Sequence, residues 1–182
     1  SLGEIIGRGG TSGIGVFSFD FGGFIVDGGH SLKSKSSFLP SSASQAKPPQ
    51  LLAHYDFPDD WEILLVILDS KNTVNGQKEV NIFQDYCPVP KNEVEQTSHI
   101  IFMNMIPFLL ERDLPAFGHS IDEIQKRGFK NVEVSLQSQQ IRDLMDKLRE
   151  IGAYGVGMSS FGPTVYSVFD KNNKHIVEEI KE

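Results

Sequence analysis

The clearest pattern of apolar and polar positions in the chain is a helical stripe near its C-terminal end. Between residues 139 and 151, apolar side chains recur three and four positions apart, which predicts an amphipathic helix that ends at Gly152. Two strand-like runs follow at 153–158 and 164–169, separated by the residues SSFGP, and they predict a hairpin. A helix that leads into a hairpin is typical of an α+β fold.

Residues 91–127 show the helical period over a longer stretch, and we expect most of them to be helical. Pro107 should kink or interrupt the first of these helices, because proline removes a backbone hydrogen bond. Asp113 resembles an N-cap, with Pro115 just inside the next helix. A shorter helix is predicted at 77–86. The apolar residues that we expect to form a core face in the first helix are Val94, Ile100, Ile101, Met105, Leu109 and Leu110.

Three other apolar segments predict strands. Residues 61–68 form a continuous apolar run, which predicts a buried strand. Residues 12–31 alternate apolar with small residues and predict two short strands, broken at Gly22-Gly23. The alternation at 129–137 predicts a strand or an extended link. Together these elements predict an α+β sandwich with helices on one face of an antiparallel sheet.

One internal segment has no apolar period. Residues 32–50 contain six serines and three prolines, so we expect a mobile surface loop or linker rather than a substrate lid. Helical patterns reach both ends of the chain, with a last helix predicted from Asn172. We therefore expect the chain to be a piece of a longer protein, with a further strand after Glu182 that completes the sheet.

Composition narrows the classes of partner. A net charge of −7 over 182 residues argues against binding to nucleic acid, which requires many Lys and Arg side chains. No apolar run approaches the ~20 residues of a membrane span, and no signal peptide is evident, so we expect a cytoplasmic protein. The single cysteine, Cys87, allows neither an internal disulfide nor a cysteine-based zinc site. Small anionic substrates remain compatible, because loop amides bind anions on acidic proteins too.

A glycine-rich loop, GRGGTSG at residues 7–13, is the first candidate site. Its backbone amides and hydroxyls could bind phosphate, and the same glycines could simply form a turn that needs positive φ. An arginine in the loop could pair with phosphate or lie at a helix end. The residues concerned are Arg8, Gly9, Gly10, Thr11, Ser12 and Gly13.

The turn of the C-terminal hairpin is the second candidate site. Serine and glycine are common in solvent-exposed turns, but this turn is unusually apolar, which favours a loop that faces a substrate. The candidate binding residues are Met158, Ser159, Ser160 and Gly162. Elsewhere, Asp20 and Asp27 are expected to be solvated, and His30 is a weak candidate acid. We expect no protein metal site, and the catalytic residues stay unknown at this stage.

Two stretches resemble the GHMP kinase superfamily. GAYGVGMSSFGPTVYSV at 152–168 is similar to its third conserved motif, and GRGGTSGIGVFSFDFGGFIVDGG at 7–29 is similar to an earlier segment. The sequences of both stretches, together with YDFPDDWEILLVI between them, closely resemble those of the archaeal β-ribofuranosylaminobenzene 5′-phosphate synthases. This resemblance extends over nearly the whole chain. The resemblance implies a GHMP-kinase-like, ferredoxin-like α/β sandwich. Residues 1–50 would then end an N-terminal domain, and residues 51–182 would form a truncated C-terminal α+β domain.

The resemblance also implies a reaction. The synthases join phosphoribosyl diphosphate to an aromatic acid such as 4-aminobenzoate or 4-hydroxybenzoate and release CO₂ and diphosphate, with Mg²⁺ bound to the diphosphate. Gly15 falls where the kinases carry a general-base Asp, and the kinase turn SGAGGGG is replaced by SSFGP at 159–163. A kinase needs that base to accept a hydroxyl proton, whereas attack by a ring carbon does not.

Two alternatives stay open from the sequence. One is an ATP-dependent small-molecule kinase of the same superfamily with displaced catalytic groups. The other is a non-catalytic fold that forms a homodimer through the apolar helices at 94–110. In the main interpretation the partners are small molecules, phosphoribosyl diphosphate and an aromatic acid, and the fragment alone is inactive.

Overall fold

The computed structural model divides into two compact units, Ser1–Phe57 with Asn75–Pro88, and Pro58–Val74 with Val89–Glu182. The division predicted between residues 50 and 51 refers to family domains and stays a prediction. None of the helices in the described part of the chain is long and apolar enough to cross a membrane. The residues that the structure describes are 8–31, 33, 39–40, 44, 46–69, 74, 76–173, 175 and 178–179.

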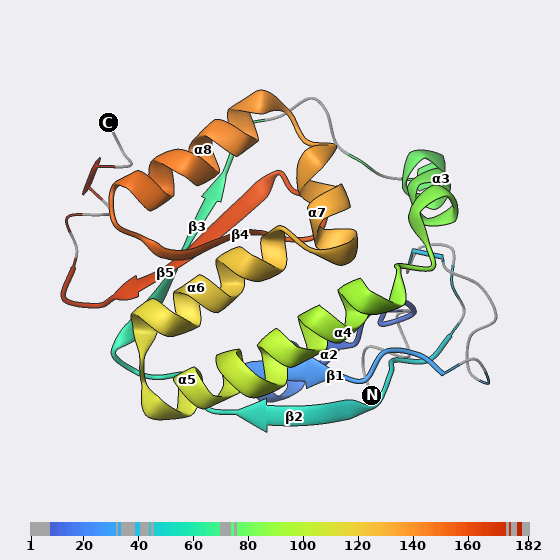
Figure 1. The fold of residues 1–182 in the computed structure, drawn as a ribbon, viewed down its shortest axis with the longest axis horizontal. Coiled ribbons are helices and arrows are strands. Elements are labelled where there is room, and N and C mark those ends of the chain that lie inside the picture. Colours follow the sequence, from blue (N-terminus) through green and yellow to red (C-terminus); the bar gives the residue numbers. More distant parts are fainter. Residues whose placement is uncertain are drawn as a thin grey trace. The chain divides into compact units, whose positions relative to one another are not determined.

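Among its described residues, the first unit contains two helices and a strand pair (Figure 1). Its elements are α2 (Ile14–Phe21), β1 (Phe24–Asp27), β2 (Leu51–Tyr55) and α3 (Gly76–Tyr86). β1 and β2 pair antiparallel, so the strand predicted after Gly23 is confirmed. α3 confirms the short helix predicted at 77–86. The described residues between 32 and 50 contain no helix or strand, and the predicted mobility of that segment stays a prediction.

The first strand predicted within 12–31 is wrong, because residues 14–21 form the helix α2. Three phenylalanines alternate with Ser18 and Asp20, which imitates the period of a strand. The helix starts at Gly13, whose backbone N–H donates to Asp27 Oδ2 at 2.8 Å. This long-range bond fixes the start of the helix, and no local sequence pattern predicts the bond.

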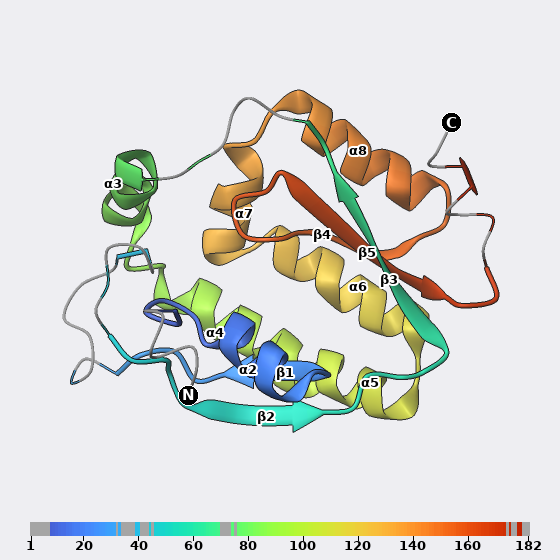
Figure 2. The ribbon, with the colours of Figure 1, turned by 180° about the vertical axis from the view of Figure 1, so that it is seen from behind.

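The second unit contains a three-stranded antiparallel sheet in the order β3-β5-β4, flanked by helices (Figures 1 and 2). The α+β class and the antiparallel sheet are confirmed. The predicted hairpin and the helix before it are also confirmed. The elements are β3 (Trp61–Ile67), α4 (Lys91–His99), the π-helix η2 (Ile100–Met105), α5 (Ile106–Glu111), α6 (Leu114–Gln125), α7 (Gly128–Ser135), α8 (Gln139–Glu150), β4 (Tyr154–Met158) and β5 (Thr164–Asp170).

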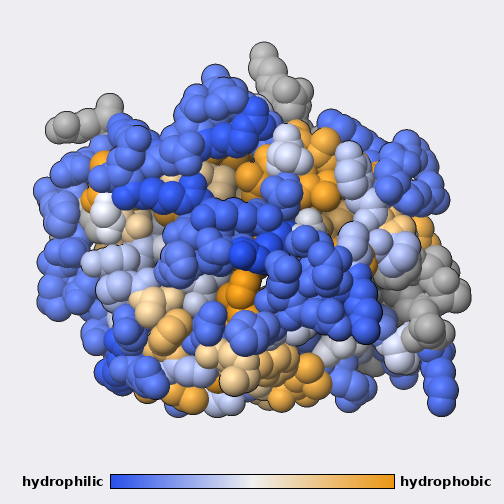
Figure 3. Space-filling model, in the orientation of Figure 1, coloured by the Kyte–Doolittle hydropathy of each residue, from blue (hydrophilic) through white to orange (hydrophobic). Residues whose placement is uncertain are grey.

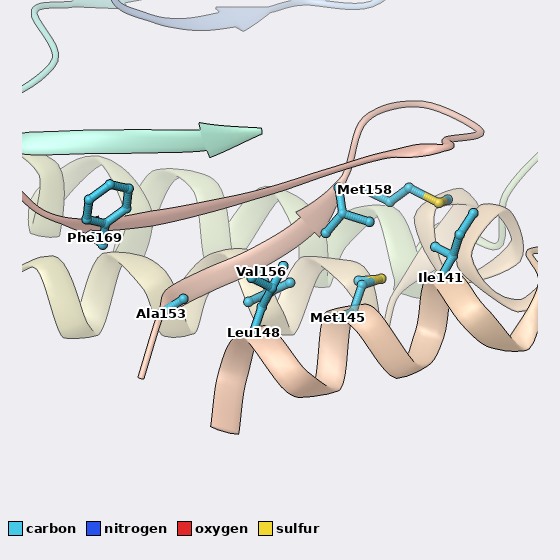
Figure 4. Packing of buried hydrophobic residues seen from close by; sticks show 8 residues of the cluster. Ile141, Met145, Leu148, Ala153, Val156, Met158 and Phe169 are labelled. Atoms are coloured by element: carbon cyan, nitrogen blue, oxygen red, sulfur yellow. The ribbon is translucent and has the colours of Figure 1, made fainter. Parts of the chain in front are cut away.

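The core of this unit lies between α8 and the hairpin. Figure 4 shows Ile141, Met145 and Leu148 of α8 directed towards Val156 and Met158 of β4. Gly152 has φ +90° and ends α8, as predicted. The apolar stripe predicted from the sequence of α8 is therefore the face of the helix that packs against the hairpin.

β3 is a strand, as predicted, but it is not buried throughout. Leu64 and Val66 pack against the α8 core, whereas the alternate residues Ile63, Leu65 and Ile67 are 54%, 60% and 70% exposed. Within the described sheet β3 pairs with β5 alone and is an edge strand. A continuous apolar run does not distinguish a strand covered on both faces from one covered on a single face.

The helical region 91–127 is confirmed. As predicted, the first helix is interrupted near Pro107, where the π-helix η2 replaces the α-helical hydrogen bonding, and Asp113 caps α6 by accepting from the Ala116 N–H at 3.1 Å. Val94 and Leu110, predicted to face the core, are exposed, as are Phe102 and Met103. The π-helical turn changes the angular position of residues around it, so a constant period of 3.6 fails there. Figure 3, in the orientation of Figure 1, shows patches of apolar surface among hydrophilic side chains.

The strand or extended link predicted at 129–137 is wrong, because α7 covers most of this segment. The backbone N–H of Gly128 donates to Glu93 Oε2 at 3.0 Å, which satisfies a free N–H at the start of the helix. The bond joins residues that are 35 positions apart, so local alternation could not reveal it. The helix predicted from Asn172 lies largely outside the described residues.

The approach of α6 to β4 gives a first test. A Cβ atom at Gly118 would lie 2.7 Å from the Gly155 backbone nitrogen, whereas one at Gly15 would meet nothing within 4 Å. We expect Gly118→Ala to lower the free energy of unfolding by about 1–3 kcal/mol, despite the better helix propensity of alanine. Gly15→Ala, the control, should raise it by about 0.5–1 kcal/mol. Urea titration measures both, and equal effects would contradict the packing argument.

The core contains one buried hydroxyl without a partner among the described residues, Ser167 Oγ. Burying a hydroxyl without a hydrogen bond costs about 1–3 kcal/mol. We expect Ser167→Ala to leave the free energy of unfolding unchanged or to raise it by about 1 kcal/mol. Met145→Ala in the same core should lower it by about 2–5 kcal/mol and shows that the assay responds to this core. A loss above about 1 kcal/mol in Ser167→Ala would mean that the hydroxyl is bonded.

Candidate functional site

The two candidate segments lie in different units of the structure. Residues 8–13 belong to the first unit, and the turn at 158–163 belongs to the second. Each segment has a geometry of its own, which shows what its donors can reach.

The glycines of the first loop are required by close packing. Gly9 has φ +88°, and a Cβ there would lie 2.6 Å from Pro48 Cγ. A Cβ at Gly10 would lie 3.0 Å from Ser44 Cβ, and one at Gly13 would lie 2.4 Å from the Phe17 ring. This supports the interpretation in which the glycines form a tight turn.

Asp27 organises this loop. Its Oδ2 accepts from Ser12 Oγ at 2.9 Å and from the Gly13 N–H at 2.8 Å, and its Oδ1 accepts from the Gly29 N–H at 2.9 Å. The expectation that Asp27 is merely solvated is wrong, whereas Asp20 is exposed as expected. The sequence holds no signal for this role, because Asp27 is 15 residues away from Ser12 and 14 residues away from Gly13.

The bonding of the loop changes which donors can meet an anion. Asp27 places a carboxylate at the start of α2, where a phosphate would otherwise be attracted. Thr11 Oγ1 donates to the Leu39 carbonyl at 2.6 Å, so it also points into the protein. Arg8 is exposed and is the one cationic side chain among residues 8–13. His30 Nε2 lies 2.7 Å from the Lys47 carbonyl, and the structure gives it no further role.

The second candidate segment is a tight turn with a buried and an exposed side. Met158 and Phe161 are 1% and 5% exposed, and the Phe161 ring packs edge-on against Phe129. These apolar residues serve the core, so the turn is not an apolar tip in contact with solvent. Ser159 and Ser160 are exposed, and their hydroxyls have no partner among the described residues. Hydroxyls in this position can donate to an anion.

Sequence reasoning missed three residues that hold this turn from behind. Gln125 Oε1 accepts from the Met158 N–H at 3.0 Å, and the Gln137 side-chain amide donates to the Phe161 carbonyl. Lys130 Nζ donates to the carbonyls of Met158 and Ser160 at 3.1 and 3.4 Å. Gln125 and Gln137 are buried. No signal in the sequence could have found them, because each bond spans more than twenty residues.

Tyr166 lies beside the turn and stays neutral. A Cβ on Gly157 would come within 2.4 Å of the Tyr166 hydroxyl oxygen, so glycine there makes room for the ring. Burial, followed by the nearby carboxylates of Asp122 and Glu133, raises the pKa of Tyr166 to about 12. The phenol is therefore a hydrogen-bond donor at neutral pH and not a base.

The described residues contain neither a base at the kinase position nor a metal cluster. Gly15 lies in the first turn of α2 with open space around it. No three His, Cys, Asp or Glu side chains in the described ranges come together as ligands for a metal ion. Mg²⁺ often binds through substrate phosphates with few protein ligands.

Comparison with known proteins gives two results. Residues 105–182 match the family described as GHMP kinases C terminal. The chain is 54% identical over 181 residues to beta-ribofuranosylphenol 5′-phosphate synthase of Methanothermobacter thermautotrophicus, with all of the chain and 55% of that protein covered. It is 49% identical to the proteins of the same name from Archaeoglobus fulgidus and Methanocaldococcus jannaschii, covering 100% and 98% of the chain and 56% and 54% of those proteins.

Residues 105–182 are therefore similar to the C-terminal domain of GHMP kinases. The resemblance to the archaeal synthases is confirmed along the whole chain, and with it the GHMP-kinase-like fold class. The chain spans about 55% of the length of the curated relatives that it matches. The activity of the whole protein is therefore a matter for proposal.

The bonds of Asp27 give a test of how the glycine-rich loop is held in place. Asp27→Asn keeps the shape but replaces one acceptor oxygen by an amide that faces a donor. We expect the free energy of unfolding to fall by about 1.5 kcal/mol or more, since bonds to a charged group are among the stronger ones. The Gly13 and Gly29 amides should exchange with deuterium faster. Asp20→Asn, on the exposed side of α2, is the control, and equal behaviour of the two variants would contradict the role of Asp27.

Proposed function

We propose that the chain is part of a synthase that transfers a phosphoribosyl group to the ring carbon of an aromatic acid. Identity of 54% along the entire chain to a named synthase carries this proposal. The open position at Gly15 supports it, because a kinase of this superfamily needs a carboxylate there and this reaction does not.

The proposed reaction balances without a base. A bond forms between the anomeric carbon of phosphoribosyl diphosphate and the ring carbon that carries the carboxylate, and the bond to diphosphate breaks. The carboxylate then leaves as CO₂, and its bonding electrons restore the aromatic ring. The protein has to bind diphosphate and stabilise the positive charge that develops on the sugar. Mg²⁺, when bound through the diphosphate, would neutralise its charge.

The relatives' name also bears on the acceptor. Their product is called a ribofuranosylphenol 5′-phosphate, so we propose 4-hydroxybenzoate rather than 4-aminobenzoate as the acid. The exposed hydroxyls of Ser159 and Ser160 are proposed to donate to the diphosphate or phosphate oxygens. Met158 and Gly162 contribute to the proposed site by shaping the turn, since Met158 is buried.

The test uses the full-length protein with phosphoribosyl diphosphate, Mg²⁺ and carboxyl-labelled acid. We expect release of labelled CO₂ and diphosphate in equal amounts, faster with 4-hydroxybenzoate than with 4-aminobenzoate. Ser160→Ala should lower kcat/KM about tenfold to a hundredfold, as expected for a lost bond to a charged group. Ser18→Ala, on the exposed part of α2, is the control and should stay within about twofold.

Two outcomes would contradict the proposal. Formation of ADP from ATP with homoserine, mevalonate, galactose or pantoate, and no CO₂ release, would favour the kinase. A homodimer that binds neither diphosphate nor aromatic acid would favour the non-catalytic alternative, for which the exposed residues Phe102, Met103 and Leu110 offer an apolar surface.

A further inference from the structure

The 158–163 turn adopts a conformation that its own residues do not favour. Ser160 has φ +49°, in the left-handed region that residues other than glycine rarely occupy. Two bonds within the hairpin help to close the turn: Ser159 N–H to the Thr164 carbonyl and Gly162 N–H to the Ser159 carbonyl, both 2.9 Å. Strained residues of this kind persist where surrounding contacts determine the backbone. The shape of the turn therefore depends partly on groups outside it.

Lys130 supplies the contacts at the strained position. Its ammonium donates to the carbonyls on either side of Ser159, those of Met158 and Ser160, and it forms an ion pair with Glu133. An ammonium group has three N–H donors and these three acceptors use all of them. The Glu133 side chain is buried, and the Lys130 side chain is mostly buried. Lys130 consequently has no N–H donor left over for a ligand.

We infer that Lys130 is a positioning residue of the proposed site. It holds the turn so that the hydroxyls of Ser159 and Ser160 face solvent together, and it does so without contacting the ligand itself. Its pairing with Glu133 also cancels its charge locally, which distinguishes it from a lysine that binds phosphate as a point charge. The inference rests on the proposed function for the identity of the ligand, and the effect on the turn can be measured without that function.

The test compares two matched double variants of the full-length protein. Lys130→Met/Glu133→Gln removes the bonds to the turn together with both charges, so that no buried carboxylate is left without a cation. Lys126→Met/Glu123→Gln removes another pair, 2.9 Å apart, from the neighbouring helix α6 and its end; this pair is more exposed, and its glutamate also pairs with Arg127. In the wild type, hydrogen bonds from Lys126 and Arg127 lower the pKa of Glu123 to about 2, so this control pair is also fully charged. Neither of its members contacts the turn.

Two measurements follow. Hydrogen exchange at the Ser159 and Gly162 amides should become at least about tenfold faster in the Lys130 variant and stay within about twofold in the control. The KM for phosphoribosyl diphosphate should rise about tenfold, while the KM for the aromatic acid stays within about twofold. A general loss of stability would move both KM values together, so the split between substrates separates positioning from a merely structural role.

The outcomes separate this inference from the proposed function. Unchanged exchange at both amides would overturn the role of Lys130, whether or not the enzyme is active. Faster exchange with an unchanged KM for phosphoribosyl diphosphate would overturn its link to binding. A wild type without turnover would sink the proposed function alone. Calorimetric titration with inorganic diphosphate would then replace the KM, and about tenfold weaker binding in the Lys130 variant would still support the inference.

Discussion

The close approach of α6 to β4 is the constraint on which the second unit depends. Gly118 and Gly155 lie backbone to backbone, where any side chain would clash. At this distance Gln125 reaches the Met158 N–H and Asp122 meets Arg149 Nε at 2.9 Å, while Arg149 also donates to the Val156 carbonyl at 3.3 Å. Among the described residues, side chains of α6 and α8 thereby bond two backbone groups of β4, the Met158 N–H and the Val156 carbonyl.

The hydrogen bonds to Met158 also hold the turn that follows β4. Met158 is the last residue of β4 and the first of the 158–163 turn, and it is bonded on both sides, through its N–H and its carbonyl. Asp27 has the equivalent role in the other unit, where it fixes the glycine-rich loop. A loop that is ordered before binding loses less conformational entropy when a ligand arrives. Both candidate segments are therefore held in place by polar side chains outside the segments themselves.

The periodic elements could be predicted from the sequence, whereas the groups that hold the loops could not. α8, the hairpin and the cap at Asp113 follow from local spacing, and the structure contains all three. The strands predicted in place of α2 and α7 were wrong, because at the start of each helix a backbone N–H donates to a distant carboxylate. That carboxylate is Asp27 for α2 and Glu93 for α7. Alternation within a short segment reports only local chemistry and cannot register such a bond.

The candidate residues show the same division. The sequence identified the exposed Ser159 and Ser160 by composition, since serine and glycine mark turns. It identified Met158 for the wrong reason, because that residue serves the core. Lys130 and Gln137 looked like members of a strand or an extended link, and their role appears only when α7 and the following residues lie against the turn. Support for a loop is a long-range property, and a single sequence does not encode it in any pattern that can be read locally.

Net charge explains why such support would matter for the proposed reaction. A chain with a net charge of −7 repels a diphosphate at long range, so attraction has to come from local donors. Neutral hydroxyls and amides are weak anion ligands one at a time, and they become effective when several are fixed to face one ligand. Lys130 and Glu133 hold one set of donors without adding to the net charge. In the proposed function, donors fixed in this way would allow an acidic protein to bind an anionic substrate, which a count of charges in the sequence does not reveal.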